Sequence, residues 1–269
     1  MPDSFYLPAG EDTWLATPHT TGPWDARAQH AGPPSALLGR SIQRCAPRDD
    51  MMVTRFTCEI LGAVPVGEIQ VRARLARPGR SVELLEAVAT AGGREVARAA
   101  AWRVKRADAP EVAPRGEPPP PLPGQSPAGA DWPTASRGWV DGYLSAIDWR
   151  PVRGHFTQPG PATVWARLRY PLVPGEEPSP LERVLAIADS GNGVSSELDL
   201  REWLFINPEL TVHLHREPAG EWICLDAQAV ISPGGAGLAT SVLSDTHGQI
   251  GVGAQALLVV RRPPPAAGD

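Results

Sequence analysis

The sequence predicts an α+β protein made of two tandem repeats, in each of which a helix packs against an antiparallel sheet. Three observations lead to this fold class. The chain has 269 residues, 42% hydrophobic and 20% charged, which is enough apolar material for a sizeable core. Polar and apolar residues alternate along several segments, as they do in half-buried strands. A set of turn signals also recurs about 150 residues further along the chain.

The repeat is defined by three turns that occur in the same order in both halves. A Pro-x-Gly-Glu sequence begins at Pro65 and again at Pro218, 153 residues later. Pro-Gly pairs follow at 78–79 and 233–234. Gly-centred turns come next at Gly93 and Gly248, 155 residues apart. Three signals at nearly one offset indicate an internal duplication.

Each half is expected to contain a helix between strands. The helices are predicted at 32–44 and 179–189, and each carries proline in its opening turn, where the missing N–H does no harm. Apolar residues recur at helical spacing in both. Segment 164–168 is expected to be a first strand, and 68–76 alternates strictly as a strand with one dry face. A helix wrapped by an antiparallel sheet is the hotdog arrangement, so the chain is predicted to be a double hotdog with one continuous sheet.

Proline sets the expected domain boundaries. Segment 107–136 is rich in proline, which cannot enter a helix interior or a central strand, so it is predicted to be an extended surface linker. The N-terminal hotdog is then expected at 1–106 and the C-terminal hotdog at 137–262, followed by a tail at 263–269.

Charge and cysteine content exclude several classes of protein. The net charge is −5 and the basic residues are scattered, so no nucleic-acid surface is expected. Cys45, Cys58 and Cys224 lie too far apart for a CxxC metal site, and an odd number makes a poor disulfide framework. His213 and His215 lack a carboxylate or cysteine at ligand spacing, so no metal site is expected.

Other sequence features that are absent exclude further classes of protein. The N-terminus lacks a secretory signal, and no apolar run reaches the roughly 18–20 residues that span a bilayer. A soluble, cytoplasmic protein is therefore expected. No Gly-x-Ser-x-Gly sequence is present, which argues against an α/β-hydrolase triad.

Six segments carry a more specific pattern: GPWDARAQHAGPPSALLGR (22–40), LARPGRSVELLEA (75–87), GREVARAAAWRV (93–104), AIADSGNGVSS (186–196), LTVHLHREPAGEWICLDAQ (210–228) and GQIGVGAQALLVV (248–260). As an ordered set they resemble the acyl-CoA thioesterase II-like, double-hotdog family, particularly its actinobacterial members. The resemblance implies hydrolysis of fatty acyl-CoA to free acid and CoA, a role in fatty acid metabolism, no covalent intermediate and no cofactor. It also implies that double-hotdog units pair into homodimers or higher homo-oligomers.

The resemblance points to particular residues. In that family an Asp, a Ser or Thr hydroxyl and a Gln hold the attacking water, and these positions fall on Asp189, Asn207 and Gln255. Asn207 departs from the hydroxyl pattern, although an amide can also bond a water. Thr211, on the same strand, is an alternative hydroxyl.

The chemistry agrees with these residue types. A thioester carbonyl is reactive enough for a water that one carboxylate orients and partly deprotonates. The developing oxyanion needs donors, and a helix N-terminus offers free backbone N–H groups. The first helix begins at Gly32, where a ligand could approach the backbone closely. We therefore expect the Gly32 N–H to be an oxyanion donor, with Ala31 and His30 beside it.

Two other functions remain open. A hotdog enoyl-CoA hydratase pairs an Asp with a His a few residues later, but SGNGVSS follows Asp189 and contains no His. A non-catalytic protein that binds acyl-CoA or another acyl ligand is consistent with Asn207 in place of the hydroxyl. Binding retained without turnover would identify the second alternative.

Overall fold

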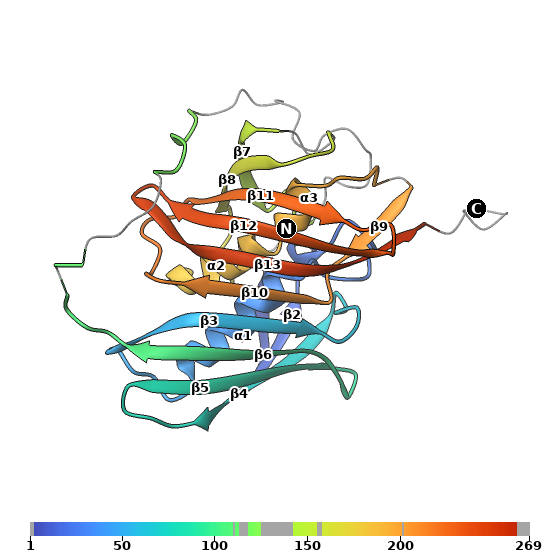
Figure 1. Cartoon of the computed structure of the whole chain (residues 1–269). Helices are drawn as coiled ribbons and strands as arrows, with labels where there is room; N and C mark the ends of the chain where they lie inside the picture. Colours follow the sequence, from blue (N-terminus) through green and yellow to red (C-terminus); the bar gives the residue numbers. More distant parts are fainter. Residues whose placement is uncertain are drawn as a thin grey trace.

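A single antiparallel sheet of 13 strands curves around the helices of the chain (Figure 1). The structure is a computed structural model that describes residues 3–109, 111–112, 118–124, 142–154, 158–200 and 202–262. One continuous sheet with the main helices on its concave side confirms the predicted α+β double hotdog.

The elements follow the order expected of a duplication. The first half contains β1 (Tyr6–Gly10), β2 (Thr13–Ala16), a 3-10 turn (Pro18–Thr20), α1 (Gly32–Arg44), β3 (Met51–Ile60), β4 (Glu68–Arg77), β5 (Val82–Ala91) and β6 (Arg94–Lys105). The second half contains β7 (Ile147–Arg153), β8 (Ala162–Leu168), α2 (Pro180–Ala188), α3 (Gly191–Val194), β9 (Trp203–Ile206), β10 (Glu209–Leu214), β11 (Ile223–Ile231), β12 (Ala236–Asp245) and β13 (Gly248–Arg261).

The strand order shows the duplication directly. The sheet runs β1-β2-β4-β5-β6-β3-β10-β13-β12-β11-β8-β7, so the second half repeats the first in reverse around the β3–β10 junction. Each half has two strands before its helix, where the sequence had indicated a first strand only. The short strand β9 is not part of this linear order and pairs only with β13. It has no equivalent among the described strands of the first half.

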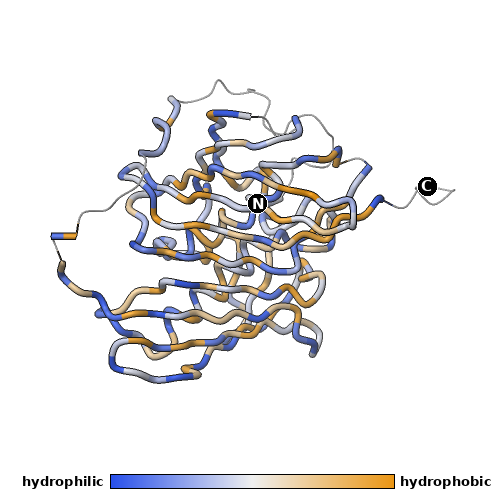
Figure 2. The backbone as a smooth tube through the Cα atoms, in the orientation of Figure 1, coloured by the Kyte–Doolittle hydropathy of each residue, from blue (hydrophilic) through white to orange (hydrophobic). Residues whose placement is uncertain are grey.

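The core lies between the sheet and the helices. Hydrophobic and hydrophilic residues alternate along many strands in Figure 2, and burial alternates with them along β11 and β12. Leu37, Leu38 and Ile42 of α1 are fully buried at helical spacing, as expected. Burying each such side chain contributes about 1.5–3 kcal/mol, so this stripe fixes α1 against the sheet.

The two long helices pack against each other in opposite directions. Near the end of α1, Gln43 accepts a hydrogen bond of 2.7 Å from Ser179, the N-cap of α2. At the other end, a Cβ on Gly32 would lie 2.1 Å from the carbonyl oxygen of Ala186. The helices therefore approach too closely there for any side chain at position 32, and the start of α1 meets the end of α2.

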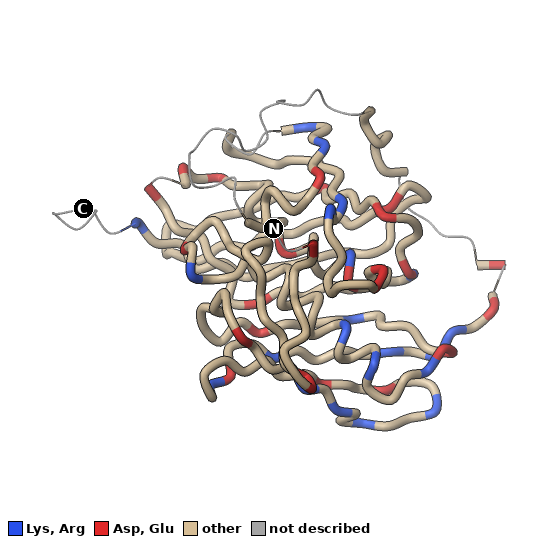
Figure 3. The backbone as a smooth tube through the Cα atoms, turned by 180° about the vertical axis from the view of Figure 1, so that it is seen from behind, with Lys and Arg blue, Asp and Glu red and all other residues tan. Residues whose placement is uncertain are grey.

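Charged side chains on the strands of the first half pair across neighbouring strands. Lys and Arg are frequent in the lower part of Figure 3, where Asp and Glu lie among them. Arg74 on β4 pairs with Glu86 directly opposite on β5, and the buried Arg103 and Glu83 on β6 and β5 lie 2.6 Å apart. Such opposite pairs add to the specificity of strand register.

The proline-rich segment is only partly described. Residues 107–109, 111–112 and 118–124 contain no helix or strand, and the carbonyls of Pro120 and Pro123 accept hydrogen bonds from Trp165 and Arg150 of the second half. The rest of the expected linker and the tail at 263–269 lie outside the described residues. In the part of the chain that the structure describes, no helix is long and apolar enough to cross a membrane.

We predict that Gly32→Ala destabilises the fold by about 1–3 kcal/mol, because the added methyl group forces α1 away from the backbone of α2. Gly67→Ala is the matched control, since a Cβ there meets nothing within 4 Å. Urea unfolding measures both. Equal free energies of unfolding for the two variants would contradict the close helix contact.

Candidate active site

Asp189 lies where the two helices meet. It is the C-cap residue of α2, and its backbone N–H donates to the carbonyl of Ile187. Only 2% of the residue is exposed. A buried carboxylate needs hydrogen-bond partners to remain ionised, so its surroundings determine what it can do.

Three side chains from distant parts of the sequence meet the Asp189 carboxylate. Nδ2 of Asn207 donates to Oδ1 over 2.8 Å, and Nε2 of Gln255 donates to the same oxygen over 3.2 Å. Nδ1 of His30 lies 3.2 Å from Oδ2. The structure thus brings together Asp189, Asn207, Gln255 and His30, four of the residues that sequence reasoning singled out.

Asn192 of α3 orients both amides and was missed by sequence reasoning. Its backbone N–H donates to Oε1 of Gln255 over 3.0 Å, and its Nδ2 lies 3.4 Å from Oδ1 of Asn207. Because the amide oxygens are occupied in this way, the amide NH₂ groups of Gln255 and Asn207 face the carboxylate. The only sequence signal was the position of Asn192 three residues after Asp189.

His30 is held flat against Tyr143. The two rings stack with centroids 3.8 Å apart and planes within 9°. The Tyr143 hydroxyl lies 2.8 Å from both the carbonyl of Ala186 and Oγ of Ser190, which fixes the tyrosine to α2. Burial lowers the pKa of His30 below 6.5, and Asp189 offsets only part of this effect. The imidazole is therefore neutral at neutral pH.

The absence of a side chain at Gly32 has a structural explanation that differs from the expected one. Sequence reasoning took its missing side chain as an opening for a ligand, but the space is occupied by the carbonyl of Ala186. The Gly32 N–H donates a hydrogen bond of 3.1 Å to Nδ1 of His30. Its role as an oxyanion donor, with Ala31 beside it, stays a prediction.

The structure does not bring Thr211 to this cluster. Leu210 and Val212 of β10 point into the core, so Thr211 between them points to the opposite face of the sheet. Its hydroxyl bonds to Oγ1 of Thr57 over 3.2 Å and to the Glu209 carboxylate over 3.0 Å.

A small cavity of about 30 Å³ lies beside the cluster. Its polar side chains belong to His30, Ser190 and Asn192, and the rest of the wall is mainly apolar. It is lined by Pro23, Trp24, His30, Leu144, Trp149, Ser190, Asn192, Gly193, Val194 and Leu200. The volume is enough for one ordered water, which needs two to four polar partners.

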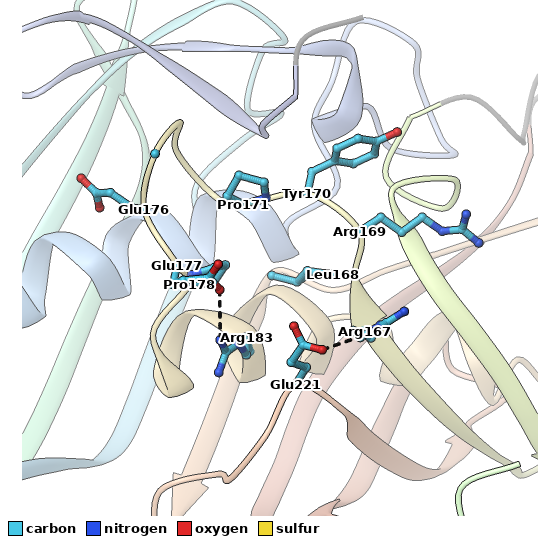
Figure 4. A pocket seen from close by; sticks show the side chains of 11 residues that line it. Arg167, Leu168, Arg169, Tyr170, Pro171, Glu176, Glu177, Pro178, Arg183 and Glu221 are labelled. Carbon is cyan, nitrogen blue, oxygen red and sulfur yellow. Dashed lines mark hydrogen bonds and ion pairs between the residues drawn. The ribbon is translucent and has the colours of Figure 1, made fainter. Parts of the chain in front are cut away.

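The opposite end of the helix pair is built differently. There the side chain of Arg40 from α1 pairs with Glu176 over 2.8 Å, next to the capped start of α2. A larger pocket of about 410 Å³ adjoins this end, and two of its three arginines are paired with carboxylates: Arg167 with Glu221 and Arg183 with Glu177 (Figure 4). The third, Arg169, donates to the carbonyl of Ile147. The duplication has therefore produced two unlike ends, and the buried carboxylate with its amides lies at only one of the two.

Solved structures confirm the fold at low sequence identity. The chain is similar to a Thermobifida fusca structure provisionally assigned as a thioesterase II, with 18% identity, a TM-score of 0.71 and 96% of each chain covered. It is also similar to a hot dog fold protein of unknown function from Alicyclobacillus acidocaldarius (15%, TM-score 0.70, 94% of this chain and 93% of that chain). A third is the acyl-CoA thioesterase II TesB2 of Mycobacterium marinum (15%, TM-score 0.64, 96% and 94%).

Family profiles identify the class of protein. Two profiles of acyl-CoA thioesterase domains match the chain, which identifies it as a thioester hydrolase. Profiles of the acyl-CoA thioesterase C-terminal and N-terminal domains match residues 88–259 and 20–104. The chain therefore belongs to the acyl-CoA thioesterase family. A search of curated proteins gives no match.

We predict that His30 makes folding stability fall with acidification. Because its pKa is lowered in the folded protein, the unfolded chain binds more protons once the pH drops below about 6.5. The contribution of His30 to stability is fully present above that value and is lost progressively as the pH falls below it. Urea unfolding at pH 7.5 and 5.5 should show a smaller loss in His30→Gln; an unchanged loss would refute the prediction.

Proposed function

We propose that the protein hydrolyses fatty acyl-CoA to free acid and CoA by attack of a water, with no covalent intermediate. The observation that carries this proposal is the buried Asp189 carboxylate, whose Oδ1 is held by two amides and whose Oδ2 faces an imidazole. Fixed polar groups of this kind can orient a water and stabilise charge without reorganising during the reaction.

The residue types fit thioester hydrolysis. The step needs a base that takes a proton from the attacking water, and the Asp189 carboxylate supplies it. Gln255 and Asn207 hold the carboxylate in one position and fill the places that the family gives to an amide and a hydroxyl. An amide here donates to Asp189 as a hydroxyl could, which supports a catalytic role for Asn207 despite its departure from the family pattern.

The oxyanion that forms on the thioester carbonyl also needs a donor. The Gly32 N–H at the start of α1 donates to Nδ1 of His30 over 3.1 Å, so it belongs to the same cluster as Asp189, and an oxyanion would replace the imidazole as its acceptor. The positive end of the α1 dipole adds to its effect. We therefore keep Gly32 as the proposed oxyanion donor.

We predict that Asp189→Asn lowers thiol release by roughly 10²-fold or more, the range expected for losing an acid–base group. A panel of short-to-long acyl-CoA substrates, followed with a thiol reagent, measures the rate. Glu182→Gln is the matched control, a buried carboxylate on the same helix whose capping bond a Gln retains, and it should stay within about twofold. Activity that survives in Asp189→Asn would refute the site.

Two further outcomes concern the function itself. Acyl-CoA binding without CoA release by the unaltered protein would identify a non-catalytic acyl-binding protein. Hydration of an enoyl-CoA without CoA release would identify a hydratase instead.

A further inference from the structure

The small cavity joins the polar cluster to an apolar wall. His30 and Asn192, two members of the cluster around Asp189, line it together with Ser190. Most of the remaining wall is apolar or aromatic: Pro23, Trp24, Leu144, Trp149, Val194 and Leu200. Such a wall suits a hydrocarbon chain better than the arm of CoA, whose amides would lose their hydrogen bonds there. The cavity is therefore the place for the acyl group of a thioester held beside Asp189.

The size of the cavity limits how much of an acyl chain fits. Its volume of about 30 Å³ holds little more than one water, and a methyl group is about as large as a water. Roughly one to three carbon atoms beyond the carbonyl therefore fit without rearrangement. A longer chain has to displace part of the wall.

Trp24 separates this cavity from a second hydrophobic cluster. The indole lines the cavity and also packs against that cluster, which is distinct from the main core. Trp24 and Phe205 pack edge to face, with ring centroids 5.2 Å apart and planes at 85°. The guanidinium carbon of Arg262 lies 5.4 Å from the centroid of the indole. These two contacts hold the indole in place, so a chain that outgrows the cavity meets a fixed barrier.

The second hydrophobic cluster continues the apolar surroundings behind Trp24. Its buried residues come from β9, β11, β12 and β13, and they are Phe205, Ala229, Ala239, Leu257 and Val259. Two of the five are alanines, which fill little space. Removal of the indole would therefore extend the cavity toward surroundings that suit further methylene groups. The side chain at position 24 thus decides where the acyl pocket ends.

We propose that the protein acts on short acyl-CoA, with acyl groups of roughly two to four carbons, and that Trp24 sets this limit by closing the acyl pocket. This assignment rests on the proposed thioesterase function and names its substrate class. One methylene more or less in an apolar pocket changes kcat/KM by about 10- to 200-fold, so a pocket of fixed depth selects strongly for chain length.

A series of saturated substrates from acetyl-CoA to palmitoyl-CoA tests the limit. For the unaltered protein, kcat/KM should be highest among acetyl-, propionyl- and butyryl-CoA and at least about tenfold lower for octanoyl-CoA. Trp24→Ala should raise the ratio of kcat/KM for octanoyl-CoA to that for butyryl-CoA at least about tenfold. Both rates come from one preparation, so this ratio does not depend on how much of the variant folds.

Two further variants separate the pocket from general packing. Trp24→Leu keeps an apolar side chain against Phe205 and should shift the same ratio in the same direction, by a smaller factor. Trp203→Ala is the matched control. Trp203 packs against the same second cluster, and the guanidinium carbon of Arg261 lies 4.7 Å from its ring centroid. It is not among the described residues that line the cavity, so its loss should change the ratio by no more than about twofold.

The possible results distinguish the chain-length limit from the function itself. A preference of the unaltered protein for dodecanoyl- or palmitoyl-CoA would overturn the limit and leave the thioesterase function standing. An unchanged ratio in both Trp24 variants would do the same for the role of the indole. No CoA release by the unaltered protein on any acyl-CoA would refute both proposals.

Discussion

The site depends on how closely the two helices approach. Gly32 at the start of α1 touches the backbone of Ala186 near the end of α2, and no other residue would fit there. This contact brings the loop that carries His30 to the carboxylate that ends α2. Each half of the duplication supplies one side of the junction, so neither half alone could hold the imidazole against the carboxylate.

The junction is kept rigid by partners for each polar group. Asn192 fixes the two amides, the amides fix Asp189, and Tyr143 fixes the imidazole. A buried carboxylate with fixed partners in a water-poor site interacts more strongly with a developing charge than it would in solvent. The same rigidity explains why the cavity beside His30 has room for little more than one water.

Much of the fold and part of the site could be predicted from the sequence. Proline at the helix starts and helical spacing predicted both helices, and turn signals and alternation predicted most strands, because these features are local. Asp189, Gln255 and Asn207 came from the family resemblance. The stacking of Tyr143 on His30 and the amide contacts of Asn192 could not be predicted, since they join residues far apart in the chain. Asn207, which bonds to Asp189, directly follows strand β9. The four residues of this strand carry no periodic signal.

The central claim is that water, and no protein group, attacks the thioester beside Asp189. A single turnover with enzyme in excess, run in H₂¹⁸O, tests it directly by mass spectrometry of the released acid and of the peptide that contains Asp189. The account predicts one ¹⁸O atom in the acid and none in the peptide. Label in the Asp189 peptide would show that its carboxylate had formed an acyl intermediate, and it would contradict the account.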